Sequence, residues 1–200
     1  FSNRMIFRLI LGGTCFFFLL LSLFRVFDGR LRVYFFDVGQ GDAAYIRTPS
    51  GDDVVLDAGR DNTVVHALGR QLPFFDHTLE ALILTHSDTD HITGAAELLR
   101  HYQVKQVFVF SRPTDSPVWA SFLTAAEQEH TKIFYPKAGD VLSFGDTELL
   151  FLSPLATQDV RVLSDNEASF VNQLRFGENT FLFTADIGEA QEKILVEHYG

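Results

Sequence analysis

The sequence predicts an α/β protein in which mixed β-sheets are flanked by helices, preceded by one N-terminal transmembrane helix. Three observations lead to this fold class. Short apolar segments of strand length alternate with segments of helical spacing along residues 31–200. Several strand pairs are separated by short glycine-containing turns, which predicts hairpins beside βα units. Residues 9–24 contain no charged residue between Arg8 and Arg25, which predicts a membrane segment.

With its apolar flanks included, this uncharged run forms a predicted single-pass anchor at residues 5–27, whose arginines reach toward the headgroups. A cleaved signal peptide is an alternative, but the end of the run, LFRVFDG, lacks the small residues of a cleavage site. A buried helix of a globular domain is the third alternative. The arginines on both sides do not decide the orientation. A short N-terminus usually stays in the cytoplasm, so we expect a cell-membrane protein whose globular domain is extracytoplasmic.

The strands are predicted from short runs of apolar, aromatic and β-branched residues that are bounded by turn residues. Turns at 38–42 and 49–52 separate the first three strands, which predicts an antiparallel start. Turns around Gly145 and Gly177 predict two later hairpins. The predicted strands are 31–37, 43–47, 53–56, 79–84, 106–110, 132–135, 141–144, 148–152, 170–175 and 180–183.

The helices are predicted where apolar residues recur at intervals of three and four. Residues 63–72 have this spacing and follow Asp61 and Asn62, either of which can act as the N-cap. The other predicted helices are 93–101, 118–129 and 188–198. We find no internal repeat and no low-complexity linker.

The composition excludes several functional classes. Of the 200 residues, 46% are hydrophobic and 21% charged, which is typical of a globular domain with a real core. The single cysteine, Cys15, lies in the apolar run, which excludes a disulfide scaffold and a CxxC zinc site. A net charge of −10 disfavours non-specific nucleic-acid binding, so a phosphate substrate would need a metal ion. We interpret the phenylalanine-rich stretches as core and membrane segments rather than platforms for stacking bases.

The strongest chemical signal is the run THSDTDH at residues 85–91. It follows a predicted buried strand and offers four metal ligands: His86, Asp88, Asp90 and His91. Imidazole and carboxylate together suit Zn²⁺, Mn²⁺ or Fe²⁺. The alternative is an acidic surface loop whose aspartates cap a helix. Two histidines that bracket two aspartates favour the metal site.

Further acids stand where predicted strands end. Asp186 and Asp57 each follow an apolar strand, although an aspartate there can simply cap a helix. Asp37 and Asp42 flank the turn Val-Gly-Gln-Gly, where they could hydrogen-bond ligand histidines or merely form a turn. Ser169 lacks a GxSxG context, so a serine hydrolase is not supported.

Three motifs in order carry a family resemblance: FDVGQGDA at 36–43, LDAG at 56–59 and HSDTDH at 86–91. Together they resemble the metallo-β-lactamase superfamily, and within it the hydrolase domain of ComEC/Rec2-type competence proteins. The resemblance covers about residues 31–195. It implies an αβ/βα sandwich with two mixed β-sheets, flanked by helices, over residues 31–200.

The resemblance also implies roles for individual residues. His86, Asp90 and His91 match the family pattern, while Asp88 stands where a histidine is common but where the ComEC-like branch carries aspartate. Asp186 matches the acid that bridges two metals in the family.

Two more expectations come from the resemblance. Asn166 and Ser169 match an N-x-x-S segment of the branch, in place of a metal-binding histidine in other branches. The last family histidine is expected beyond Gly200, so we expect the last ligand segment to be missing and the chain, which starts at Phe1, to be a fragment.

The implied activity is metal-dependent hydrolysis with one or two ions of Zn or Mn. Asp90 and His91 would be catalytic, and the substrate a phosphodiester, as for a nuclease or phosphodiesterase in competence and DNA uptake. Partners would be the membrane, a nucleic acid or another phosphodiester, and channel or uptake proteins, because only one predicted span precedes the domain. Two alternatives stay open: a hydrolase of cell-envelope phosphodiesters such as phosphorylcholine, and a non-catalytic membrane-tethered module with a degenerate site.

Overall fold

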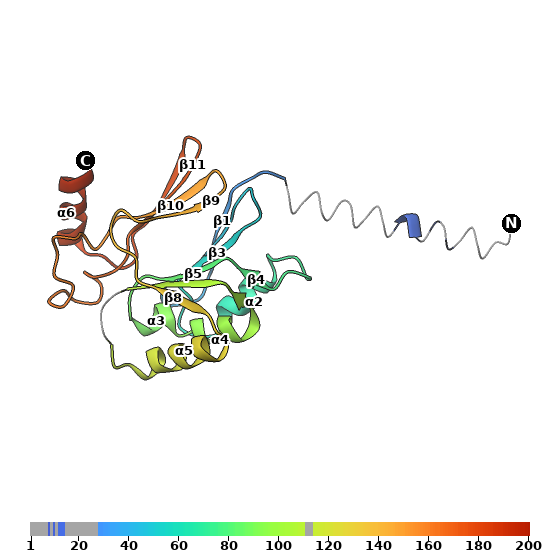
Figure 1. The fold of residues 1–200 in the computed structure, drawn as a ribbon, viewed down its shortest axis with the longest axis horizontal. Helices are drawn as coiled ribbons and strands as arrows, with labels where there is room; N and C mark the ends of the chain where they lie inside the picture. Colours follow the sequence, from blue (N-terminus) through green and yellow to red (C-terminus); the bar gives the residue numbers. More distant parts are fainter. Residues whose placement is uncertain (1–7, 9, 11, 15–27, 111–113) are drawn as a thin grey trace.

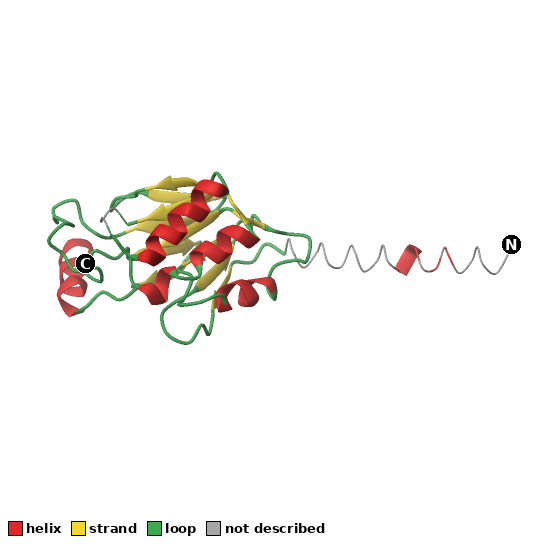
Figure 2. Cartoon of the chain, turned by 90° about the horizontal axis from the view of Figure 1, so that it is seen from below, coloured by secondary structure: helices red, strands yellow, loops and turns green. Residues whose placement is uncertain are grey.

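Two β-sheets pack face to face, and helices cover the outer face of the larger sheet (Figures 1 and 2). The computed structural model describes residues 8, 10, 12–14, 28–110 and 114–200. The predicted class, an α/β sandwich with strands and helices alternating along the chain, is confirmed. Most predicted elements are found within one to three residues of their expected bounds, because their hydrophobic periodicity and turn residues agree.

The larger sheet has six strands in the order β1-β2-β3-β5-β7-β8. β1, β2 and β3 are antiparallel neighbours, and β3, β5, β7 and β8 run parallel to one another. This sheet is therefore mixed, as predicted. The bounds of its strands are β1 Arg32–Phe35, β2 Ala44–Arg47, β3 Asp53–Leu56, β5 Ala81–Leu84, β7 Gln106–Val109 and β8 Lys132–Phe134.

The second sheet has the order β12-β11-β10-β9 and is antiparallel throughout, where we expected a second mixed sheet. Tight turns at Gly145 and Gly177, both with positive φ, join its hairpins and impose antiparallel pairing. A short parallel pair, β4 with β6, was not predicted. The strand bounds are β9 Val141–Phe144, β10 Thr147–Phe151, β11 Asn172–Phe176, β12 Asn179–Phe183, β4 Thr78–Leu79 and β6 Gln103–Val104.

The helices differ from expectation at two places. The predicted loop between residues 85 and 93 contains a short helix, α3, because Asp88 takes the extended N-cap position and the next residues turn into a helix. The outer helix layer expected over the second sheet is not formed by α6, which lies beside the end of that sheet (Figure 1). Most of α6 is exposed, so it has no broad apolar face to cover a sheet. The helix bounds are α2 Thr63–Gly69, α3 Thr89–Ile92, α4 Ala95–His101, α5 Pro117–Gln128 and α6 Glu189–Tyr199.

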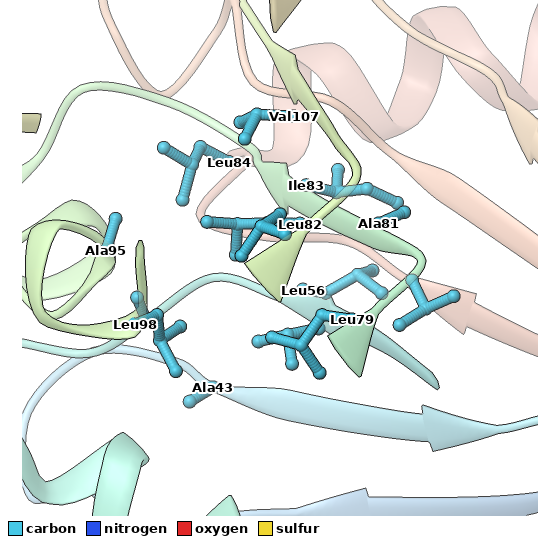
Figure 3. Packing of buried hydrophobic residues seen from close by; sticks show 14 of the residues in the cluster. Ala43, Leu56, Leu79, Ala81, Leu82, Ile83, Leu84, Ala95, Leu98 and Val107 are labelled. Atoms are coloured by element: carbon cyan, nitrogen blue, oxygen red, sulfur yellow. The ribbon is translucent and has the colours of Figure 1, made fainter. Parts of the chain in front are cut away.

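The core is centred on β5, whose four residues, Ala81 to Leu84, are all buried. Figure 3 shows β5 packed between Leu56 of β3, Val107 of β7 and Leu98 of α4. A parallel strand that is covered on both faces needs an uninterrupted apolar sequence, which is why ALIL lacks the alternation of a half-exposed strand. This buried strand fixes the position of the residues that directly follow it.

Among the described residues, no helix is both long enough and apolar enough to cross a membrane. The predicted anchor at residues 5–27 lies almost entirely outside them, so it stays a prediction.

Candidate metal centre

The candidate site lies at the carboxyl ends of β3 and β5. Leu56 and Ile83 are register partners in these parallel strands, so the residues that follow each strand meet at one edge of the sheet. Asp57 follows β3, its backbone N–H bonding to the carbonyl of Ile83, while Thr85 and His86 follow β5. The neighbouring loop at residues 37–42 closes the site from the other side, since the Gly59 N–H donates to the Asp42 carbonyl over 3.0 Å.

The carboxylate of Asp57 contacts both Thr85 and His91. Its Oδ1 accepts a hydrogen bond from the backbone N–H of Thr85 at 2.8 Å. Its Oδ2 accepts from Thr85 Oγ1 at 2.7 Å and lies 2.9 Å from His91 Nδ1. The residue has a φ of 56°, a left-handed conformation that aspartate tolerates better than most residues. Both carboxylate oxygens are therefore engaged in holding neighbours.

These bonds determine which ring nitrogens remain available as acceptors. The Thr85 hydroxyl donates its proton to Asp57, so its bond of 2.9 Å to His86 Nδ1 requires that Nδ1 carry the hydrogen. His91 Nδ1 likewise donates to the Asp57 carboxylate. In its neutral form, each histidine therefore has its lone pair on Nε2, and this is the form in which imidazole binds a metal.

The two Nε2 atoms are buried and have no hydrogen-bond partner among the described residues. Their side chains are each 1% exposed, and the ring centroids lie 4.1 Å apart. His86 Nε2 faces Asp88 Oδ2 at 3.6 Å, and His91 Nε2 faces Asp186 Oδ1 at 3.5 Å. Two buried acceptors that face carboxylates, with nothing to donate to them, fit divalent metal ions.

The pKa shifts of the two histidines have opposite directions. Burial lowers the pKa of His86 and outweighs the opposing charge of Asp57, and the charge of neighbouring His91 lowers this pKa further. Burial also opposes protonation of His91, but the hydrogen bond that His91 donates to Asp57 and the nearby carboxylates raise the pKa of His91 to about 9. Burial raises the pKa of Asp42. The acidic surroundings of His91 therefore favour a positive charge at this position, which a bound cation would supply.

The structure brings several of the predicted ligands together. Within the described residues, two groups have ligand atoms within 4.8 Å of one another: Asp57, His86 and His91, and Asp42, His91 and Asp186. Because both oxygens of Asp57 already hold Thr85 and His91, we assign it an orienting role rather than a ligand role. Asp42, which was expected behind the ligands or as a possible ligand, lies within ligand distance of His91 and Asp186.

Asp88 and Asp90 are not part of either group, although Asp88 lies next to His86. Asp90 lies in α3 directly before His91, and the backbone of Gly41 packs against its backbone carbonyl. A side chain on Gly41 would overlap that carbonyl, so the GQGD turn needs glycine here for close approach.

The remaining predicted residues lie at the margin of the site. Asp37 is exposed, and its Oδ1 accepts from the Gly39 N–H at 3.3 Å, which is a turn contact. Asn166 and Ser169 belong to a loop that is tied to the histidine motif: the Phe170 N–H donates to the Thr85 carbonyl at 3.0 Å. Ser169 is buried and donates to the backbone of its own loop.

Two contributors were not singled out from the sequence. Thr85 sets the orientation of Asp57 and His86, and Ser87 Oγ donates to Asp165 in the loop that follows β10. The only sequence signal for either was its place inside the THSDTDH run. A pocket of about 230 Å³ borders the site and is lined by Asp42, Thr85 and apolar side chains of β1 and β12.

Comparison with known proteins finds matches over most of the chain. The family model described as "Metallo-beta-lactamase superfamily" matches residues 36–199. ComE operon protein 3 of Bacillus subtilis is 30% identical over 92% of this chain, and Recombination protein 2 of Haemophilus influenzae is 28% identical over 82%. The chain spans only 26% and 19% of these two relatives.

Two further likenesses are more partial. Exodeoxyribonuclease YycJ of Bacillus anthracis is 28% identical over 54% of this chain, which covers 39% of that protein. The crystal structure of the metallo-beta-lactamase fold protein YhfI from Bacillus subtilis superposes with a TM-score of 0.51 at 17% identity. That match covers 72% of this chain and 55% of YhfI, and it is a likeness of fold alone.

Proposed function

Because this chain belongs to the metallo-beta-lactamase superfamily of hydrolases, we propose that it hydrolyses phosphodiester bonds with the help of divalent metal ions, Zn or Mn. The observation that carries the proposal is the pair of buried Nε2 atoms of His86 and His91, which lack donors and face carboxylates. In the neutral imidazoles, the inferred tautomers leave both atoms as acceptors.

We assign His86 and Asp88 to one metal position, from their separation of 3.6 Å. His91 and Asp186, which are 3.5 Å apart, would hold a second position. Asp42 lies close enough to complete this second position. When bound, such ions would lower the pKa of a coordinated water and would neutralise charge that develops on a phosphoryl group.

The protein's own residues would then position the reaction. Asp57 keeps the His91 ring oriented through its bond to Nδ1. We propose that Asp90, next to His91 in α3, orients the attacking water, as the family resemblance implies. Burial of both imidazoles excludes bulk water from the ligand atoms, which strengthens electrostatic interactions inside the site.

We propose DNA as the substrate, with a role in DNA uptake. Two relatives that cover most of this chain are named ComE operon protein 3 and Recombination protein 2, and a third is named an exodeoxyribonuclease. The net charge of −10 argues against tight DNA binding by the surface itself. A channel or uptake protein at the cell membrane would then present the strand to an anchored, extracytoplasmic domain.

The test is cleavage of a labelled single-stranded DNA by the full chain, purified in detergent, with Mn or Zn added. We expect cleavage by the native chain and by His66→Ala, since His66 is exposed on α2. His91→Ala and Asp186→Asn should lose it. Metal binding without cleavage of any phosphodiester would favour the non-catalytic module, and cleavage of a phosphorylcholine ester alone would favour a cell-envelope substrate.

A further inference from the structure

The chain enters the larger sheet at the end opposite to the metal centre. Arg32 pairs with Arg47, and Arg47 pairs with Asp53, so these three residues mark one end of strands β1, β2 and β3. The pair of Leu56 and Ile83 marks the other end, where the metal centre lies. The two ends are separated by the length of a strand, and residues 28–31 leave the domain from the first end.

A loop with two exposed phenylalanines projects from this same end. Residues 72–77 lead through β4 into β5, which begins at Ala81, the partner of Val54. Phe74 is 88% exposed and Phe75 is 49% exposed. Figure 1 shows the loop beside β4 extending on the side where the chain leaves toward its N-terminus, and Figure 2 places both at the same end of the domain.

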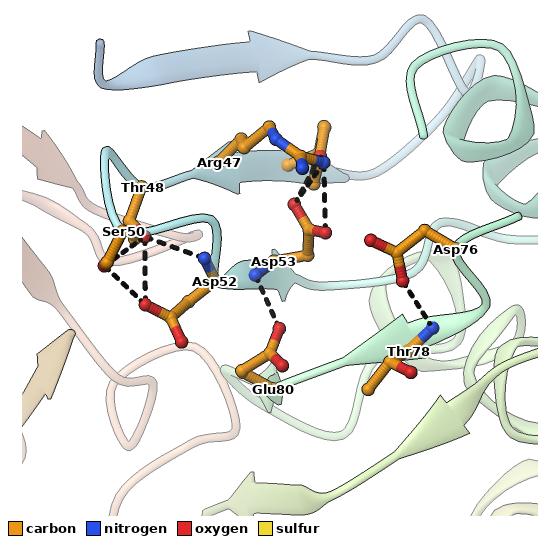
Figure 4. Close-up of polar contacts among 9 residues, drawn as sticks. Arg47, Thr48, Ser50, Asp52, Asp53, Asp76, Thr78 and Glu80 are labelled. Carbon is orange, nitrogen blue, oxygen red and sulfur yellow. Dashed lines mark hydrogen bonds and ion pairs between the residues drawn. The ribbon is translucent and has the colours of Figure 1, made fainter. Parts of the chain in front are cut away.

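The loop presents these rings from a firmly held base. The Asp76 N–H donates to the Pro73 carbonyl at 2.8 Å, which closes a turn with both phenylalanines at its tip. Asp76 Oδ1 accepts from the Thr78 N–H at 3.2 Å (Figure 4). Leu72, before the turn, belongs to the hydrophobic core. The exposure of the two rings is therefore built into a hydrogen-bonded turn, which leaves two adjacent apolar side chains available to a partner.

The sequence indicates what lies opposite this tip. The predicted membrane anchor at residues 5–27 ends immediately before residues 28–31, which precede β1. Four extended residues reach about 14 Å at most. If residues 5–27 span the bilayer, the end of the domain that carries Phe74 and Phe75 lies close to its surface. Exposed Arg70, at the base of the loop, suits the anionic headgroups there.

We propose that Phe74 and Phe75 insert into the lipid interface. This contact would orient the domain so that the metal centre faces away from the bilayer. Aromatic side chains on a surface loop favour the boundary between headgroups and acyl chains. The inference rests on the predicted anchor and is independent of the phosphodiesterase activity. The domain would then contact the membrane at two places: the predicted anchor at residues 5–27 and the loop tip at Phe74 and Phe75.

The test places a single tryptophan at the tip. Trp119, the one native tryptophan, is buried against Phe110 and Phe122, so Trp119→Phe keeps an aromatic ring there. In this background, Phe74→Trp is the probe. Val162→Trp is the matched control, because Val162 is 80% exposed and lies on the loop that contacts the metal centre through Asp165.

The full chain is reconstituted into vesicles of phosphatidylcholine and phosphatidylglycerol, with or without bromine on the acyl chains. Flotation of the vesicles first tests the anchor, and circular dichroism checks the fold of each variant. We expect the emission of the Trp at position 74 to be blue-shifted and at least about twofold lower in brominated vesicles, because the ring contacts acyl chains. The Trp at position 162 should be unaffected. Phe75→Trp gives a second probe if Phe74→Trp folds poorly.

Three results would overturn the inference. Failure of the chain to float removes the anchor on which it rests. Equal quenching at positions 74 and 162 in a chain that floats shows that the tip does not enter the lipid. A blue shift that depends on protein concentration, without bromine quenching, shows that a second copy covers the rings instead.

Discussion

Asp57 Oδ2 lies 2.9 Å from Nδ1 of His91, and this contact ties the end of β3 to helix α3 across 34 positions of sequence. The same carboxylate accepts two hydrogen bonds from Thr85, which directly precedes His86. One buried acid thereby sets the orientation of both histidines. In metal sites, such an acid behind a ligand histidine fixes the ring and its tautomer.

Asp57→Asn should weaken Zn binding by about 10- to 100-fold, because an amide has one acceptor oxygen where the carboxylate serves three donors. Asparagine tolerates the φ of 56°, so the fold should be kept. Competition with a chromophoric chelator measures the affinity. Asp61→Asn is the control, since Asp61 accepts a bond from the Thr63 N–H on the surface. An unchanged Zn affinity in Asp57→Asn would contradict the orienting role.

Removal of both histidines should abolish metal binding. We expect the native chain, purified with metal present, to hold about one or two equivalents of Zn or Mn by elemental mass spectrometry. His86→Ala/His91→Ala should hold none, because it removes the two buried Nε2 ligands. His66→Ala, which changes an exposed imidazole, should keep the metal. If the native chain binds no metal, residues 85–91 do not form a metal centre.

Two glycines of one turn should respond differently to alanine. Gly39 and Gly41 have nearly the same φ, 81° and 80°, but a Cβ on Gly41 would overlap the Asp90 carbonyl whereas Gly39 faces open space among the described residues. Gly39→Ala should lower the free energy of unfolding by about 1–2 kcal/mol from backbone strain alone. Gly41→Ala should cost about 3 kcal/mol or more. Urea denaturation measures both, and equal losses would show that the contact with Asp90 is unimportant.

A buried acid far from the metal centre should make stability depend on pH. Burial raises the pKa of Asp53 from 3.8 to about 7, even though the Tyr45 hydroxyl and Arg47 hydrogen-bond to it. Figure 4 shows Arg47 beside Asp53. The folded chain then holds this proton more tightly than the unfolded chain. The stabilisation is therefore complete below about pH 4 and is lost as the pH rises through about 7.

Urea denaturation at about pH 5 and about pH 8 measures this loss. The free energy of unfolding should fall more between the two pH values in the native chain than in Asp53→Asn, which cannot titrate at this position. The same fall in both chains would show that Asp53 does not carry the effect.

Much of the site could be recognised from residues that are close in sequence. The THSDTDH run follows a fully buried strand, and the apolar sequence of that strand predicts where it ends. Asp186 was likewise found from its place after an apolar strand. The role of Thr85 was not found, because a threonine before a histidine has no distinctive pattern until Asp57 is placed beside it. Local sequence identifies candidates, whereas contacts across the sheet assign their tasks.

By itself, the sequence determined the types of the main elements, the buried strand β5 and the family of the fold, because these depend on periodicity, turn residues and ordered motifs. Only the tertiary structure decided which acids meet the histidines. Asp88 and Asp90 look equivalent in sequence, but Asp88, in the extended N-cap position, lies 3.6 Å from His86 Nε2, whereas Asp90 lies within α3 and outside both ligand groups. The register of β3 and β5 also brings Asp57 to His91. The second sheet and the tip at Phe74 were decided in the same way, by hairpin geometry and by a turn that keeps its rings outside the core.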